Sequence, residues 1–223
     1  MYQELKRLME SIGVRWAVCG GDAIDLFVGK QTRLHKDIDV AVLWDDREQI
    51  IQGFLDMKWR VFEPDGGLLR EIRSLSEDLR TEDNLWCIRP GTDSYTIVRH
   101  HDNYYEISTD REDQDILDYV EVLFNRVMNG QFLYKRNPSI YLDNYLYHSE
   151  SGIPYLAPEM VLLYKSIFVR YTNSPEEAHR IMVENYRHDF DVAAEKMTME
   201  QRQWLENALL CSYPNGHEWI GKL

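Results

Sequence analysis

The chain has 223 residues, with 38 acidic side chains against 25 Lys and Arg, and its formal net charge is −13 at pH 7. This balance, without any basic run, argues against a nucleic-acid partner, whereas an acidic surface either attracts a cationic small molecule or serves solubility. No apolar run has membrane-spanning length, the first residues do not read as a signal peptide, and three scattered cysteines fit reduced thiols, so we expect a cytoplasmic protein.

The first predicted elements are a helix, a strand and a glycine turn. Apolar residues at helical spacing predict a helix over 2–12, and alternation predicts a strand over 14–19. Gly20 and Gly21 follow, and helical spacing resumes over 23–28. Glycines between a strand and a helix let backbone amides approach a phosphate, which the helix N-terminus also favours. A tight turn without any ligand uses the same two residues, so the pair alone leaves both readings open.

A second strand carries two aspartates. Asp37 and Asp39 share one face because side chains alternate along a strand, and Ile38, Val40 and Val42 then face the core. Two carboxylates about 7 Å apart on one face repel each other unless a cation lies between them. Hard oxygen ligands beside a phosphate suit Mg²⁺. The alternative is a solvated strand edge. However, a Gly-Gly pair followed by two alternating aspartates is much less expected by chance than the aspartates alone.

The motif GG-x-AIDLF-x-G-x-x-TR-x-HKDIDV resembles the opening of the nucleotidyltransferase superfamily, in the branch of aminoglycoside and lincosamide nucleotidyltransferases. Members of this branch usually carry Trp after the glycine pair, where this chain has Asp22. The resemblance implies that Gly20 and Gly21 cradle phosphate through backbone amides. It also implies that Asp37 and Asp39 hold Mg²⁺.

Four elements follow this motif. The pattern predicts a helix over 45–57, whose acids suit its N-terminus, and a short strand over 58–62. A turn at 64–67 and a strand over 84–90 come next, separated by a polar loop. Strands alternating with helices indicate an α/β architecture.

Residues 97–117 look like an insertion relative to the branch that the chain resembles. His100 and His101 could suggest a metal cluster, but adjacent residues on an extended segment point in opposite directions, which favours a surface hairpin. The insertion could instead contribute to an acceptor pocket, with the rings of Tyr104 and Tyr105.

Glu121 is the candidate for a third carboxylate. It stands in the otherwise apolar strand 119–124, where a carboxylate without a partner is costly to bury. A cation shared with Asp37 and Asp39 would supply that partner. In the family a third acid on a neighbouring strand completes the site, and Glu121 matches it. Glu106 is the rival, and a partly exposed edge residue is the structural alternative.

From residue 152 the sequence becomes helical. GIPYLAPEMVLLYKS resembles the family's entry into its C-terminal helical domain. Ser174 and Pro175 suit the start of a second helix, as N-cap and first helical residue. The segment 198–213 predicts a capped amphipathic helix.

Charged residues in these helices have two interpretations. Lys165 interrupts an apolar stretch. The resemblance implies that it contacts nucleotide phosphates. The alternative is a surface lysine whose ammonium group reaches solvent. Asp189 and Asp191 could orient Lys165 or the acceptor. We favour structural pairing with Arg187 or Lys196.

Together these features predict an α/β (α+β) enzyme in two parts. Residues 1–150 would form a nucleotidyltransferase fold, a mixed β-sheet flanked by helices that carries the metal and nucleotide site. Residues 151–223 would form a helical bundle that closes the cleft.

The reaction implied is transfer of a nucleoside monophosphate, AMP from ATP being favoured, to a hydroxyl of an aminoglycoside- or lincosamide-like molecule with release of pyrophosphate. Asp37, Asp39 and Glu121 would hold Mg²⁺, and Glu121 would also take the acceptor's proton. Arg33 and Lys165 would offset charge on the leaving pyrophosphate. The alternatives are a toxin-like nucleotidyltransferase that modifies tRNA or protein, and a non-catalytic nucleotide-binding module.

Overall fold

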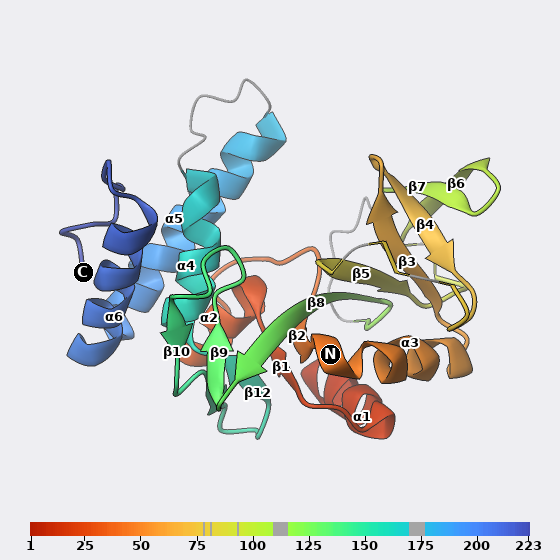
Figure 1. The fold of residues 1–223 in the computed structure, drawn as a ribbon, viewed down its shortest axis with the longest axis horizontal. Coiled ribbons are helices and arrows are strands. Elements are labelled where there is room, and N and C mark those ends of the chain that lie inside the picture. The colour runs from red at the N-terminus through yellow and green to blue at the C-terminus, as the bar shows by residue number, and fades with distance from the viewer. Residues whose placement is uncertain (78, 81, 93, 109–115, 170–176) are drawn as a thin grey trace. The chain divides into compact units, whose positions relative to one another are not determined.

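The computed structural model describes residues 1–77, 79–80, 82–92, 94–108, 116–169 and 177–223 (Figure 1). The chain forms two compact units, each built from separate stretches of sequence. Unit 1 contains residues 1–18 and 35–127, and unit 2 contains residues 19–34 and 128–223. These units do not coincide with a division at residue 150, and the functional roles expected of the two parts stay predictions.

Unit 1 is a mixed sheet with two α-helices. Its strands lie in the order β1-β2-β8-β5-β3-β4-β7-β6, and β2 and β8 form a parallel pair, whereas the other pairs within this unit are antiparallel. Its elements are α1 (Tyr2–Ile12), β1 (Trp16–Val18), β2 (Asp39–Leu43), the 3₁₀ turn η1 (Trp44–Asp46), α3 (Arg47–Asp56), β3 (Arg60–Asp65), β4 (Leu68–Ile72), β5 (Asn84–Ile88), β6 (Thr96–His101), β7 (Tyr104–Ser108) and β8 (Tyr119–Met128). The predicted mixed sheet is confirmed.

Alternation along the central strands separates a core face from a polar face. Val40 and Val42 of β2 are buried, and so are their neighbours Val122 and Phe124 of β8. The apolar stripe of α1 is buried as well, α1 packs against α3, and α3 packs against β3 (Figure 1). This burial fixes the register, because a slip by one residue would turn the valines away from the core.

The two predicted hairpin features of unit 1 are confirmed. Gly66 and Gly67 connect β3 to β4, and both have positive φ, which glycine adopts without a Cβ clash. β6 and β7 form a hairpin within the 97–117 segment, of which residues 109–115 lie outside the described chain. His100 contacts Glu106 at 3.1 Å, so within the described chain it joins a surface pair rather than a metal cluster.

Unit 2 is mainly helical. The elements are α2 (Gly20–Val28), β9 (Gln131–Leu133), β10 (Tyr141–Leu142), β11 (Leu146–His148), β12 (Pro154–Leu156), α4 (Pro158–Val169), α5 (Glu177–Lys196) and α6 (Met199–Ser212). α4 contacts α2, α5 and α6. Thr198 and Gln201 form the capping box expected at the start of the last helix. Ser174 and Pro175, expected to start α5, lie outside the described residues. No described helix is long and apolar enough to cross a membrane.

Glu159 in the first turn of α4 is a buried acid that links two helices of unit 2. It is 3% exposed, and the Gln201 side-chain amide donates a hydrogen bond of 3.0 Å to its Oε2. Burial raises the pKa of Glu159 from its ordinary 4.5 to about 7. Between these two values the unfolded chain ionises while the folded chain keeps the proton, so this group's contribution to stability is lost as pH rises toward 7.

The substitution Glu159→Gln therefore should stabilise the protein more at high pH than at low pH. At 1.36 kcal/mol per pKa unit, the gain at pH 8 has an upper bound of about 3 kcal/mol, and it shrinks toward pH 5. Urea denaturation at both pH values measures it. Glu150→Gln, at an exposed position, is the control. An equal effect of Glu159→Gln at pH 5 and pH 8 would contradict the prediction.

Candidate active site

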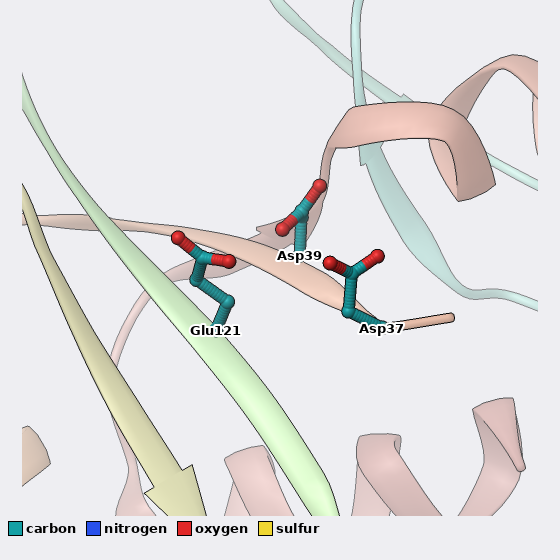
Figure 2. Close-up of side chains that lie close together, drawn as sticks. All are labelled: Asp37, Asp39 and Glu121. Atoms are coloured by element: carbon teal, nitrogen blue, oxygen red, sulfur yellow. The ribbon is translucent and has the colours of Figure 1, made fainter. Parts of the chain in front are cut away.

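Three carboxylates of unit 1 meet on the polar face of the sheet. Asp37 lies two residues before Asp39, the first residue of β2, and Glu121 lies directly opposite Asp39 in the parallel strand β8. Their ligand atoms all lie within 4.8 Å of one another, and Figure 2 shows the three side chains projecting to the same side. The structure therefore groups Glu121 with the two aspartates. Glu106, its rival, is on the outer hairpin beside His100.

The electrostatics of this cluster favour a cation. Asp37 is exposed, whereas Asp39 and Glu121 are half-buried. Burial is the main cause that raises the pKa of Glu121, and the negative charge of Asp37 adds to it, against a hydrogen bond from Asn84 that lowers it. A divalent ion would relieve this repulsion with three oxygen ligands, which is the donor chemistry that Mg²⁺ prefers.

Each oxygen of the Glu121 carboxylate has its own hydrogen-bond donor. Asn84 Nδ2 donates to Oε1 at 2.5 Å, and the Tyr119 hydroxyl donates to Oε2 at 3.3 Å. Burial, followed by the charge of Glu121, raises the pKa of Tyr119 well above its ordinary value, so its hydroxyl keeps its proton. Sequence reasoning missed both partners. Tyr119 could have been found as the same-face neighbour of Glu121, but Asn84 depends on the β5–β8 register.

Removing the Asn84 side chain should loosen the Glu121 carboxylate. Partners that orient a metal ligand typically contribute about 10- to 100-fold in metal affinity or activity, so Asn84→Ala should weaken Mn²⁺ or Mg²⁺ binding by about tenfold or more. Calorimetric titration with the metal measures this change. Asn103→Ala is the matched control, because Asn103 donates to the Glu71 carbonyl oxygen in the outer part of the sheet. Unchanged metal affinity in Asn84→Ala would exclude the orienting role.

The glycine pair lies at the start of a helix in unit 2. α2 begins at Gly20, with Cys19 as N-cap, so the helix predicted to follow the strand already includes both glycines. Gly20 has φ of 64°, a conformation that favours glycine at this sharp entry into the helix. Asp25 accepts hydrogen bonds from the backbone N–H and hydroxyl of Thr32, at 2.9 and 2.6 Å. This contact ties the loop after α2, which carries Arg33, back to the helix.

Arg33 and Lys165 share one buried carboxylate in unit 2. Asp189 of α5 is fully buried and accepts from Arg33 Nε at 2.8 Å and from Arg33 Nη2 at 3.0 Å. Lys165 Nζ lies 2.9 Å from Asp189 Oδ2 and 4.2 Å from the centre of the Tyr186 ring. Burial alone would raise the pKa of Asp189, but the Arg33 hydrogen bond and the Lys165 charge lower it overall. Asp189 is therefore ionised, and the negative charges of Asp25 and Asp22 also act on Arg33.

One alternative for these charges is excluded, and one expectation was wrong. Lys165 is not a surface lysine, because its side chain is 8% exposed. Asp189 pairs with neither Arg187 nor Lys196, since Arg187 bonds Glu218 and Lys196 donates to the Val28 carbonyl oxygen. The interpretation that Asp189 orients Lys165 agrees with the geometry.

The structure thus forms two groups from the candidate residues. Asp37, Asp39 and Glu121 converge in unit 1, and Arg33 and Lys165 converge on Asp189 in unit 2. The glycine pair starts α2 of unit 2.

Comparison with known sequence families gives a match to antibiotic adenylyltransferases. Residues 2–65 match the sequence family described as Aminoglycoside-2''-adenylyltransferase, a stretch that contains the glycine pair and both aspartates. A search among curated proteins finds no match. The match confirms the resemblance to aminoglycoside nucleotidyltransferases in the part of the chain that carries the motif.

Solved structures extend the likeness over most of the chain. The crystal structure of ANT(2")-Ia in complex with adenylyl-2"-tobramycin has a TM-score of 0.50 at 12% identity, covering 93% of this chain and 95% of that one. The solution structure of the antibiotic-resistance factor ANT(2'')-Ia gives 0.49 at 14% identity, covering 96% and 95%. Lincomycin-bound LnuA, a lincosamide antibiotic adenylyltransferase, gives 0.46 at 16%, covering 82% and 92%. The first of these establishes the nucleotidyltransferase fold.

Proposed function

We propose that this protein is a nucleotidyltransferase that moves a nucleoside monophosphate, AMP from ATP, to a hydroxyl of a small molecule and releases pyrophosphate. The observation that carries this proposal is the convergence of Asp37, Asp39 and Glu121 within 4.8 Å. The match of the family described as an adenylyltransferase to residues 2–65 supports it independently.

The donor set of this cluster fits Mg²⁺. It consists of carboxylate oxygens only, and two of the three carboxylates are half-buried, where unneutralised charge is costly. Asp37, Asp39 and Glu121 would hold the ion. When bound, it would neutralise the phosphates and favour displacement at the α-phosphorus.

The side chains of this protein would supply the remaining steps. Glu121 would accept the proton of the acceptor hydroxyl, whose oxygen then forms a bond to the α-phosphorus while the bond to pyrophosphate breaks. The backbone amides of Gly20 and Gly21 would bind phosphate oxygens at the start of α2. Arg33 and Lys165 would offset the charge of the leaving pyrophosphate.

The acceptor class is proposed from similarity and charge. The similar structures hold adenylyl-2"-tobramycin in ANT(2")-Ia and lincomycin in LnuA, and tobramycin and lincomycin are small molecules with hydroxyl groups. An acidic chain that lacks a basic run is suited to a small cationic acceptor rather than to RNA.

A screen for pyrophosphate release tests the proposal. The purified protein is incubated with Mg²⁺, ATP and single aminoglycosides or lincosamides, with GTP in place of ATP and total RNA in place of the antibiotic as parallel reactions. We expect release that needs ATP, Mg²⁺ and one of the small molecules. Release that occurs only with RNA would overturn the small-molecule assignment, and no release with any acceptor would overturn the transferase.

A further inference from the structure

We infer that Trp86, Tyr95 and Tyr119 of unit 1 form an aromatic platform that binds a ring of the acceptor. The platform selects a ring compound with an apolar face and few positive charges over a polyamine. This inference rests on the proposed function, because it takes Glu121 as the group that receives the acceptor's proton.

The location of the acceptor follows from the register of three strands. A general base must lie within hydrogen-bond reach of the hydroxyl that it deprotonates, so the acceptor ring lies within a few ångströms of Glu121. On the polar face Glu121 has Asp39 opposite it in β2 on one side and Trp86 opposite it in β5 on the other. Adjacent strands are about 4.8 Å apart. Because the aspartate side is taken by the proposed ion and the phosphates, the acceptor meets Trp86 next.

The rings of the platform support one another. The Trp86 and Tyr119 rings meet edge to face with centres 5.7 Å apart, and the Tyr95 and Tyr119 rings lie 5.3 Å apart. Tyr119 is buried beneath them, whereas Trp86 and Tyr95 are half-buried and keep part of their surface available. Aromatic surfaces held in place by packing bind ring compounds at little cost in side-chain entropy.

The charges on this face disfavour a polyamine. In the described part of β5, β3 and β4, this face carries one carboxylate, Glu71. Glu71 already pairs with Arg60 at 2.6 Å and with Arg73 at 2.9 Å. The Arg60 guanidinium lies 4.7 Å from the centre of the Tyr105 ring, so Tyr105 does not offer the free ring surface expected of it. Among these described residues of β5, β3 and β4, a second or third ammonium group on the acceptor would find no unpaired carboxylate and would meet arginines instead.

Two substitutions of Trp86 separate ring binding from packing. Trp86→Leu removes the aromatic ring, and Trp86→Phe keeps a flat ring. The indole Nε1 is buried and has no hydrogen-bond partner among the described residues, so the change to Phe removes no hydrogen bond. Ile97→Ala is the matched control, because Ile97 packs against the same apolar cluster from its outer side.

Calorimetry with two probes tests the inference. Lincomycin, with one amine, and tobramycin, a polyamine, are titrated into each protein with Mg²⁺ and α,β-methylene-ATP, which cannot release pyrophosphate. We expect lincomycin to bind the unaltered protein about tenfold or more tightly than tobramycin. Trp86→Leu should weaken lincomycin binding about 10- to 100-fold, and Trp86→Phe and Ile97→Ala by less than about threefold.

Three outcomes would overturn the platform: tighter binding of tobramycin, no binding of lincomycin to the unaltered protein, or equal effects of Trp86→Leu and Ile97→Ala. Pyrophosphate release with ATP distinguishes these from failure of the proposed function. Lincomycin binding that depends on Trp86, without any pyrophosphate release, would reject the transferase activity and support the platform. Pyrophosphate release that is insensitive to Trp86→Leu would support the transferase activity and reject the platform.

Discussion

The substitution Asp39→Asn is expected to lower nucleotidyl transfer by about a hundredfold or more while the protein remains folded. Asp39 belongs to the carboxylate cluster with Asp37 and Glu121, and an asparagine amide oxygen carries no net charge to hold a divalent ion. Pyrophosphate release at saturating Mg²⁺ and ATP measures the loss. Asp102→Asn is the matched control, since Asp102 is exposed in the β6–β7 turn with φ of 42°, a conformation that asparagine tolerates.

Stability gives this prediction a second readout. Without metal, Asp39→Asn removes one of three clustered negative charges, so the variant should remain folded. With metal, the unaltered protein should gain stability that the variant lacks, because an ion that binds only the folded state stabilises it. Full turnover in Asp39→Asn, or a Mg²⁺-induced gain equal to that of the unaltered protein, would show that these carboxylates do not hold a catalytic ion.

The substitution Asp189→Asn should be the most destabilising single change in unit 2 that we predict, by about 3–5 kcal/mol. Asp189 is fully buried and is the counter-charge of both Arg33 and Lys165. Without its carboxylate, two positive side chains that are 17% and 8% exposed face each other. Removing one partner of a buried ion pair leaves the other charge uncompensated, which costs far more than the loss of a surface pair.

The control for this substitution lies two residues further along the same helix. Asp191 is exposed, so Asp191→Asn should change the free energy of unfolding by less than about 0.5 kcal/mol. Amide hydrogen exchange of α4 and α5 reports on the local stability of unit 2 directly. Equal protection in the two variants would show that Arg33 and Lys165 do not depend on Asp189.

The members of the carboxylate cluster could be predicted from the sequence because their pattern is local. Asp37 and Asp39 are separated by one residue, and Glu121 stands alone in an apolar strand, so period-two alternation places all three on polar faces. That these faces coincide depends on the parallel pairing of β2 with β8, which lie about eighty residues apart in the chain. The resemblance supplied that pairing, and single-sequence reasoning could not.

Partners that are far apart in the chain could not be predicted, because local spacing does not show long-range pairing. Asp189 was expected to pair with charges on its own helix, yet Arg33 is 156 residues away in the chain. Local spacing identifies neighbours within one helix but says nothing about which loop packs beside it. Asn84 and Trp86 were part of a predicted strand, and only the β5–β8 register shows that they flank Glu121.

The route of the chain has a consequence for dissecting this protein. Residues 19–34 connect β1 to β2, two strands of unit 1, but they pack with residues 128–223 in unit 2. The backbone therefore crosses between the units three times. Neither half can be expressed as one uninterrupted fragment: a gene truncated at residue 150 would encode α2 without α4 and α5, the helices that cover it. Chimaeras that exchange the helical half between homologues must therefore transplant two separate segments together, and those that swap only the C-terminal one should misfold or aggregate.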